Sequence, residues 1–133
     1  MKEDIKNSIW VADDDDDDRM LIKEAFEESA YKQPLIFFEN GEKVIELLKT
    51  KSLHYPSLIL LDLNMPKVNG HDVLSFIKRN KKTKDIPVII LTTSKSKEDK
   101  ESVLSMGADG FITKPHQFVE MLKIAKNLVN HYG

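Results

Sequence analysis

The sequence of 133 residues contains no cysteine and only five glycines. Without cysteine, the chain has no disulfide, no thiolate metal site and no cysteine nucleophile. No apolar stretch approaches the ~18 uninterrupted residues of a membrane-spanning helix, and residues 1–6 carry charges where a signal peptide has an apolar core. A net basic excess, which would favour nucleic-acid binding, is also missing, because the formal charge is −2. We therefore expect a cytoplasmic protein with no membrane segment and no direct nucleic-acid partner.

The sequence does contain a regular alternation of two patterns. Short continuous apolar runs are separated by longer segments in which apolar residues recur at helical spacing. The runs predict buried strands at residues 9–12, 35–38, 58–61, 88–91 and 110–113. In the last helical segment the predicted buried stripe is Phe118, Leu122, Ala125 and Val129. This alternation predicts an α/β fold whose parallel sheet is covered by helices on both faces.

Polar side chains stand at the ends of four of these strands. In an open parallel sheet the functional crevice lies beyond the carboxyl ends of the strands, where the strand order reverses. The strand ends supply three carboxylates, a hydroxyl and an ammonium, which belong to Asp13, Asp14, Asp62, Thr92 and Lys114. We expect these groups to converge on one edge of the sheet.

The clustered carboxylates favour a bound divalent cation. Like charges raise one another's pKa, so a cation is needed to keep all three ionised. The available ligands are oxygens, which suit Mg²⁺ held by carboxylates, water and a phosphate oxygen. Neither Gly-x-x-x-x-Gly-Lys nor Gly-x-Gly-x-x-Gly is present as a phosphate-binding loop. Instead, Asp62 is the candidate nucleophile for a phosphoryl group, with Lys114 and Thr92 as partners of its oxygens.

Six separated motifs give the chain a family resemblance. They are Asp13-Asp14, Leu61-Asp62-Leu63-Asn64-Met65-Pro66, Asn69-Gly70, Pro87 to Thr92, Gly107 to Gly110, and Lys114-Pro115. In their order and spacing across residues 8–130 they resemble the receiver domain of stand-alone bacterial two-component response regulators, like those of chemotaxis. The resemblance implies a doubly wound, flavodoxin-like sheet of five strands in the order 2-1-3-4-5, in three αβα layers. It also implies a single receiver domain over residues 1–133 without a separate output domain.

The resemblance also implies what the acidic residues do. Asp62 would accept a phosphoryl group from a sensor histidine kinase or a histidine phosphotransfer protein. The chain would catalyse only this transfer and its own dephosphorylation. Mg²⁺ or Mn²⁺ would be held by Asp14, Asp62 and the backbone carbonyl of Asn64, with Asp13 acting through water.

Further implications concern the switch from the inactive to the active state. Thr92 and Lys114 would hold the phosphoryl group, and the Lys114–Pro115 peptide bond would be cis. Thr92 and the aromatic Phe111 would move on phosphorylation. The face formed by the fourth helix, the fifth strand and the fifth helix would then change its affinity for a partner, and it could also form a homodimer.

Four further aspartates, Asp15 to Asp18, follow the acidic pair and are open to three interpretations. They could belong to a disordered acidic stretch. Alternatively, Asp13-x-Asp15-x-Asp17 together with Glu24 has the spacing of an EF-hand, although Asp18 then stands where such a Ca²⁺ loop needs glycine. In the third interpretation they form a loop and the first turn of a helix, where acidic groups interact favourably with the helix dipole.

Two other classes of function remain as alternatives. A flavodoxin-like cofactor or small-molecule binder would use the same fold, but it should carry a phosphate-binding Ser/Thr/Gly loop after the first strand, where this chain is acidic. An acidic Ca²⁺-binding module would use the aspartate run without Lys114.

The basic cluster Lys78 to Lys84 could mark a nucleic-acid patch, but it lacks interleaved aromatic residues and favours a solvated loop.

Overall fold

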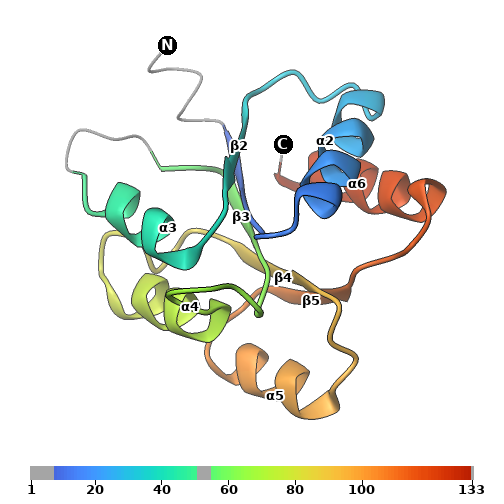
Figure 1. Cartoon of the computed structure of the whole chain (residues 1–133). Helices are drawn as coiled ribbons and strands as arrows, with labels where there is room; N and C mark the ends of the chain where they lie inside the picture. The colour runs from blue at the N-terminus through green and yellow to red at the C-terminus, as the bar shows by residue number, and fades with distance from the viewer. Residues whose placement is uncertain (1–7, 51–54, 133) are drawn as a thin grey trace.

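Five parallel strands form the sheet at the centre of the molecule (Figure 1). The computed structural model describes residues 8–50 and 55–132. The strands are β1 (Ile9–Ala12), β2 (Leu35–Phe38), β3 (Leu58–Leu61), β4 (Val88–Thr92) and β5 (Gly110–Thr113). They pair in the order β2-β1-β3-β4-β5, which confirms the predicted topology. The strand bounds also match the prediction, except that β4 extends one residue further, to Thr92.

Helices cover both faces of this sheet. They are α2 (Asp16–Glu28), α3 (Gly41–Leu48), α4 (Gly70–Arg79), α5 (Lys97–Ser105) and α6 (Phe118–Tyr132). Helices α2 and α6 pack over one face, and α3, α4 and α5 lie over the other (Figure 1). Along β1, Ile9 and Val11 enter the core under α2 and α6, whereas Trp10 and Ala12 enter the opposite core. The central strands β1, β3 and β4 are therefore buried on both sides, whereas the edge strands β2 and β5 are mostly half-buried. This burial explains the continuous apolar sequences and confirms the three-layer arrangement.

The buried stripe of the last helix, α6, agrees with the predicted one only in part. The structure buries Met121, Ala125 and Leu128, which follow the spacing i, i+4 and i+7. Phe118, predicted to be buried, is 37% exposed, and the neighbouring Val119 is 59% exposed. The prediction was right for Ala125 and wrong for Phe118, while Leu122 and Val129 are half-buried. Apolar residues occupy more than one face of this helix, and packing against α2 and the sheet selects the buried one. Within the described parts of the chain, no helix is both long and apolar enough to span a bilayer.

Polar side chains determine where several helices begin. An N-cap side chain accepts a hydrogen bond from the backbone N–H three residues later at Asp15, Asn40, Asn69 and Ser96. Such caps contribute about 1 kcal/mol each. At the start of α5 the cap at Ser96 is joined by a second side chain, that of Ser94. The Ser94 hydroxyl accepts from the Ser96 N–H at 3.1 Å and donates to the Asp99 carboxylate at 2.7 Å.

The start of α4 is seated directly on the loop that follows β3. The Gly70 N–H donates to the Leu63 carbonyl at 3.0 Å. A Cβ atom at Gly70 would lie 2.3 Å from the Asp62 carbonyl oxygen and 2.6 Å from the Leu63 Cα. Only glycine allows this approach, because the atoms in the way belong to the backbone. The backbone of the Asp62 loop is therefore held in place by the N-terminus of α4.

We expect Gly70→Ala to destabilise the protein by about 1–3 kcal/mol, the usual cost of overpacking. The clash outweighs the ~1 kcal/mol that alanine gains over glycine in a helix. Gly110→Ala is the matched control, because its Cβ would meet only the movable end of the Ile89 side chain, at 2.8 Å. Urea unfolding curves measure both changes. Equal losses in the two variants would contradict the close backbone approach at Gly70.

Candidate functional site

Two buried carboxylates lie side by side at the carboxyl edge of the sheet. Asp13 directly follows β1 and Asp62 directly follows β3, and these two strands are neighbours at the point where the strand order reverses. The Asp62 N–H donates to the Ala12 carbonyl at 3.0 Å, which extends the ladder to the site. Asp13 is 1% exposed and Asp62 is 6% exposed. Parallel topology therefore brings together two charges that are 49 residues apart in the sequence.

Asp14 completes a group of three carboxylates. One oxygen from each of Asp13, Asp14 and Asp62 lies within 4.8 Å of the others, with Asp14 on the exposed side. Asn64 reaches the same group from the loop after β3, where its N–H donates to Asp62 Oδ1 at 3.2 Å. The four residues expected around a cation thus occupy one edge of the sheet.

Lys114 enters this group from the end of β5. Its backbone N–H donates to the Thr92 carbonyl at 2.7 Å, which fixes the residue against the end of β4. The Lys114 ammonium lies 2.6 Å from Asp13 Oδ2 and 2.9 Å from Asp62 Oδ2. The side chain is only 5% exposed, so the ammonium is almost entirely surrounded by protein. The structure thus brings Lys114 to Asp13 and Asp62, as the strand order predicts.

Asp18 is a further partner of Lys114 that the sequence analysis did not assign to the site. Its Oδ2 accepts a hydrogen bond from the Lys114 ammonium at 2.7 Å. The helical phase of α2 contains the signal, because Ile22, Ala25 and Phe26 lie four, seven and eight residues after Asp18 and form the buried face of the helix. Asp15 is the N-cap and Asp16 to Asp18 form the first turn. The third interpretation of the aspartate run therefore describes the local structure.

Burial and neighbouring charges shift the pKa of Asp13, and also that of Lys114, in opposite directions. Burial raises the pKa of Asp13 above its ordinary value, although the nearby Lys114 ammonium lowers it. Burial alone would lower the pKa of Lys114, but its close contacts with the carboxylates of Asp13, Asp18 and Asp62 outweigh that effect and raise it. Lys114 therefore stays protonated at neutral pH, whereas ionisation of Asp13 is opposed.

The donor set fits a hard divalent cation. Among the described residues, Asp13 Oδ2 is a buried oxygen without a hydrogen bond, since the Lys114 ammonium lies close to it but directs its hydrogen bonds to Asp18 and Asp62. An unsatisfied buried carboxylate oxygen is costly unless a cation compensates it. With only oxygen donors, the group suits Mg²⁺ or a similar ion better than a softer metal. Asp13, Asp14 and Asp62 would hold such an ion.

Thr92 and Phe111 lie between this edge of the sheet and the surface beside α5. Thr92 is fully buried, and its hydroxyl accepts from the Ser94 N–H at 3.4 Å. Phe111 lies opposite Ile90 in the β4–β5 pair and is half-buried. It lines a groove of about 580 Å³ beside α5, together with Lys100 and Leu104. The two residues expected to take part in switching thus lie on adjacent strands between the acidic edge and the outer surface.

The Lys114–Pro115 peptide bond is trans, because no cis peptide occurs among the described residues. The cis bond implied by the family resemblance is therefore wrong for this structure. The trans isomer is the intrinsically favoured form of such a bond, by about 0.5–1 kcal/mol.

Helix α2 excludes the calcium-loop interpretation. Helical residues begin at Asp16, so Asp17 and Glu24 belong to a regular helix rather than to the 12-residue ligand loop that an EF-hand requires. The only group of three or more acidic or histidine side chains that could hold a metal ion, among residues 8–50 and 55–132, is Asp13 with Asp14 and Asp62.

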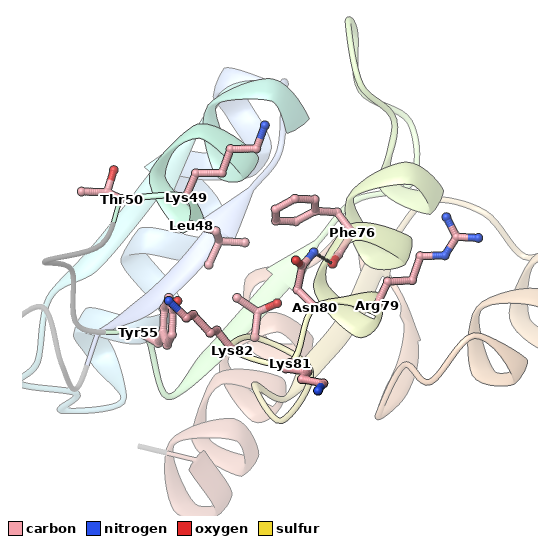
Figure 2. A pocket seen from close by; sticks show the side chains of 10 residues that line it. Leu48, Lys49, Thr50, Tyr55, Phe76, Arg79, Asn80, Lys81 and Lys82 are labelled. Atoms are coloured by element: carbon pink, nitrogen blue, oxygen red, sulfur yellow. Dashed lines mark hydrogen bonds between the residues drawn. The ribbon is translucent and has the colours of Figure 1, made fainter.

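A pocket of about 690 Å³ lies between the ends of α3 and α4 and contains none of these groups (Figure 2). Phe76 and Leu48 face into it, whereas the charged ends of Arg79 and Lys81 point away (Figure 2). Its cations therefore do not converge on a common ligand.

Lys78 is not a solvated lysine of the basic cluster, because its ammonium donates to the backbone carbonyls of Lys84 and Ile86 at 3.1 and 2.9 Å.

Comparisons with known proteins agree on one family. The sequence model of one protein family, the response regulator receiver domain, matches residues 9–126. The chain is 32% identical over 129 residues to the probable methanogenesis regulatory protein FilR2 of Methanothrix harundinacea, covering 93% of this chain and 82% of that protein. It is 31% identical over 124 residues to response regulator Rcp1 of Synechocystis sp., covering 90% of this chain and 84% of Rcp1.

Solved structures give the same result. The Mn²⁺-bound form of response regulator Rcp1 aligns with a TM-score of 0.83 and 30% identity, over 92% of this chain and 91% of that one. The phosphorylated cyanobacterial phytochrome response regulator RcpA aligns with a TM-score of 0.87 and 29% identity, over 95% of this chain and 93% of that one. Both neighbours have the fold described above.

The raised pKa of Asp13 predicts how Asp13→Asn changes stability with pH. A carboxyl whose pKa is raised on folding stabilises the fold below its unfolded pKa, and that stability is lost as pH rises through the folded pKa. The neutral amide avoids this loss. In metal-free buffer, we therefore expect Asp13→Asn to be more stable than the wild type at about pH 7, with a gain that shrinks toward about pH 4.

Urea unfolding at several pH values measures this difference. Asp72→Asn, in the first turn of α4, is the control for removing an acidic group outside the cluster. A gain for Asp13→Asn that does not depend on pH would contradict the electrostatic explanation.

Proposed function

Because this chain belongs to the response regulator receiver domain family, we propose that Asp62 accepts a phosphoryl group from a histidine kinase or a histidine phosphotransfer protein. The observation that carries this proposal is the position of Asp62, buried beside two further carboxylates and 2.9 Å from the Lys114 ammonium. Asp62 stands alone at the end of β3, whereas Asp13 and Asp14 follow β1.

The proposed reaction is an in-line transfer. A carboxylate oxygen of Asp62 attacks phosphorus and forms the O–P bond of an acyl phosphate, while the N–P bond of the donor phosphohistidine breaks. The histidine nitrogen keeps the electron pair of that bond. The signal ends by hydrolysis: water attacks the acyl phosphate and releases inorganic phosphate and free Asp62. The chain catalyses these steps only on itself, through positioning and charge neutralisation.

We propose that the divalent ion of this reaction is Mg²⁺ or Mn²⁺, held by Asp13, Asp14, Asp62 and the backbone carbonyl of Asn64. The donor chemistry of the cluster and the Mn²⁺-bound form of the related Rcp1 support this assignment. The ion supplies positive charge to the oxygens of the transferred group.

Lys114 and Thr92 are the proposed protein partners of the bound phosphoryl group. The Lys114 ammonium already contacts Asp62 and would pair with a phosphoryl oxygen carried by that residue. Among the residues that the structure describes, the Thr92 hydroxyl is held only by a long hydrogen bond of 3.4 Å from the Ser94 N–H, so little opposes its movement toward the phosphoryl group.

The proposed output surface is the face made by α5, β5 and the start of α6. Its groove carries Lys95, Lys97 and Lys100 around the apolar side chains of Leu104 and Phe111. Leu104 is 41% exposed, and the exposed Phe118 and Val119 stand at the start of α6. Movement of Thr92 gives Phe111 space to move inward, which changes the shape of this face. We propose that the changed face binds a second copy of the chain.

We expect acetyl phosphate with Mg²⁺ to add one phosphoryl mass to the wild type and none to Asp62→Asn. Intact-protein mass spectrometry measures the addition. Asp85→Asn, on the loop before β4, controls for the loss of one carboxylate and should be labelled like the wild type. Equal labelling of Asp62→Asn and the wild type would overturn the assignment of Asp62.

Phosphorylation should also shift the chain from monomer to dimer, which sedimentation velocity detects. Leu104→Glu replaces an apolar side chain of the groove with a carboxylate and should weaken the dimer about tenfold or more, because the apolar burial of Leu104 is lost and the carboxylate must be desolvated. Met20→Glu is the matched control, since Met20 is similarly apolar and 55% exposed but lies on α2. A Leu104→Glu variant that is labelled and dimerises like Met20→Glu would contradict the proposed surface.

A further inference from the structure

A fourth carboxylate reaches the site from the first turn of α2, and we propose that Asp18 is a positioning residue that holds the Lys114 ammonium. Asp18 gives this ammonium a partner outside the metal-binding group, so that Asp13 and Asp62 stay available to a divalent cation. The inference rests on the proposed function in one respect, because it takes Asp13, Asp14 and Asp62 as the metal ligands.

The contact between Asp18 and Lys114 is as short as those within the site. Lys114 Nζ lies 2.7 Å from Asp18 Oδ2, compared with 2.6 Å from Asp13 Oδ2 and 2.9 Å from Asp62 Oδ2. The Lys114 side chain is 5% exposed, whereas that of Asp18 is 32% exposed. Asp18 is not part of the group of three carboxylates whose oxygens approach one another. It therefore binds the ammonium without belonging to the cation site.

The first turn of α2 is held in the position that this contact requires. The Asp18 N–H donates to the N-cap carboxylate of Asp15 at 3.0 Å. Arg19 donates to the backbone carbonyl of Asp13 at 2.6 Å and also pairs with Asp16. These bonds fasten the helix start to the loop after β1. Asp18 is thus directed toward Lys114 by the backbone, and not by a flexible side chain alone.

The physical reason for such a residue is competition between two cations. A divalent ion entering the cluster must take carboxylate oxygens that face Lys114, and the two positive charges repel each other. An ammonium has three donors and can keep one on Asp18 while it yields another. If residue 18 were neutral, the ammonium would be shared by Asp13 and Asp62 alone and would compete more strongly with the ion.

The test uses Mg²⁺ alone as the probe, titrated calorimetrically into the full chain. Asp18→Asn should bind Mg²⁺ about fivefold more weakly than Asp17→Asn, the range expected for a partly exposed ion pair. Asp17 is the matched control, because it stands one residue earlier in the same helical turn, is exposed, and carries the same charge. The general loss of one negative charge is therefore the same in both variants.

A double-mutant cycle decides whether Asp18 acts through Lys114. In a Lys114→Met background, Asp18→Asn and Asp17→Asn should bind Mg²⁺ equally. A fivefold difference that persists without Lys114 would mean that Asp18 acts on the metal by its own charge, and it would overturn the proposal. Equal affinities in the presence of Lys114, or tighter binding by Asp18→Asn, would also overturn it. Lys114→Gln replaces Lys114→Met if the apolar side chain prevents folding.

The failure of this inference can be told apart from the failure of the proposed function. Acetyl phosphate labelling of the wild type and Asp62→Asn tests the phosphoacceptor, and Mg²⁺ affinity tests Asp18. If Asp62 is labelled while the Asp18 and Asp17 variants bind Mg²⁺ equally, only the role of Asp18 is wrong. If no label appears, the Mg²⁺ titrations still decide whether Asp18 positions Lys114.

Discussion

The interaction on which the site depends is the contact of one buried ammonium with three carboxylates. Lys114 follows β5, Asp62 follows β3, Asp13 follows β1 and Asp18 lies in α2. The contact therefore connects segments from the first, middle and last parts of the sequence. One positive charge cannot balance four nearby aspartates, counting the exposed Asp14. The imbalance leaves the edge strongly negative, which favours a divalent cation and opposes an anionic phosphoryl donor in its absence.

The core provides the rigidity that such an arrangement of charges needs. The central strands β1 and β3 are buried on both faces, and Asp13 and Asp62 follow immediately where these strands end. The close approach of Gly70 to the Asp62 carbonyl, and the hydrogen bond from the Lys114 N–H to Thr92, fix the backbone on either side of the site. The side chains are therefore positioned by the backbone, which limits how far they can relax from one another.

The sequence was sufficient to predict the strands and the convergence of Asp13, Asp62 and Lys114, because continuous apolar runs and parallel topology determine which residues share an edge. The sequence was insufficient where several neighbouring residues were equally apolar or equally acidic, so that pattern alone did not distinguish them. In α6, apolar residues lie on more than one face, and only packing against α2 selects Met121, Ala125 and Leu128. Asp18 was hidden among identical neighbours, although its helical phase relative to Ile22 distinguishes it from Asp17.

The acidic edge and the outer groove are connected by hydrogen bonds around Ser94. Its N–H donates to the Thr92 hydroxyl, and its carbonyl accepts from the Thr113 hydroxyl at 3.1 Å. Its own hydroxyl joins the Ser96 cap to Asp99 at the start of α5. If Thr92 moves toward Asp62, the Ser94 N–H loses its partner and the cap of α5 must adjust. Since only Val103 of α5 is fully buried, this helix resists displacement less than its neighbours do, and it borders the groove that contains Phe111.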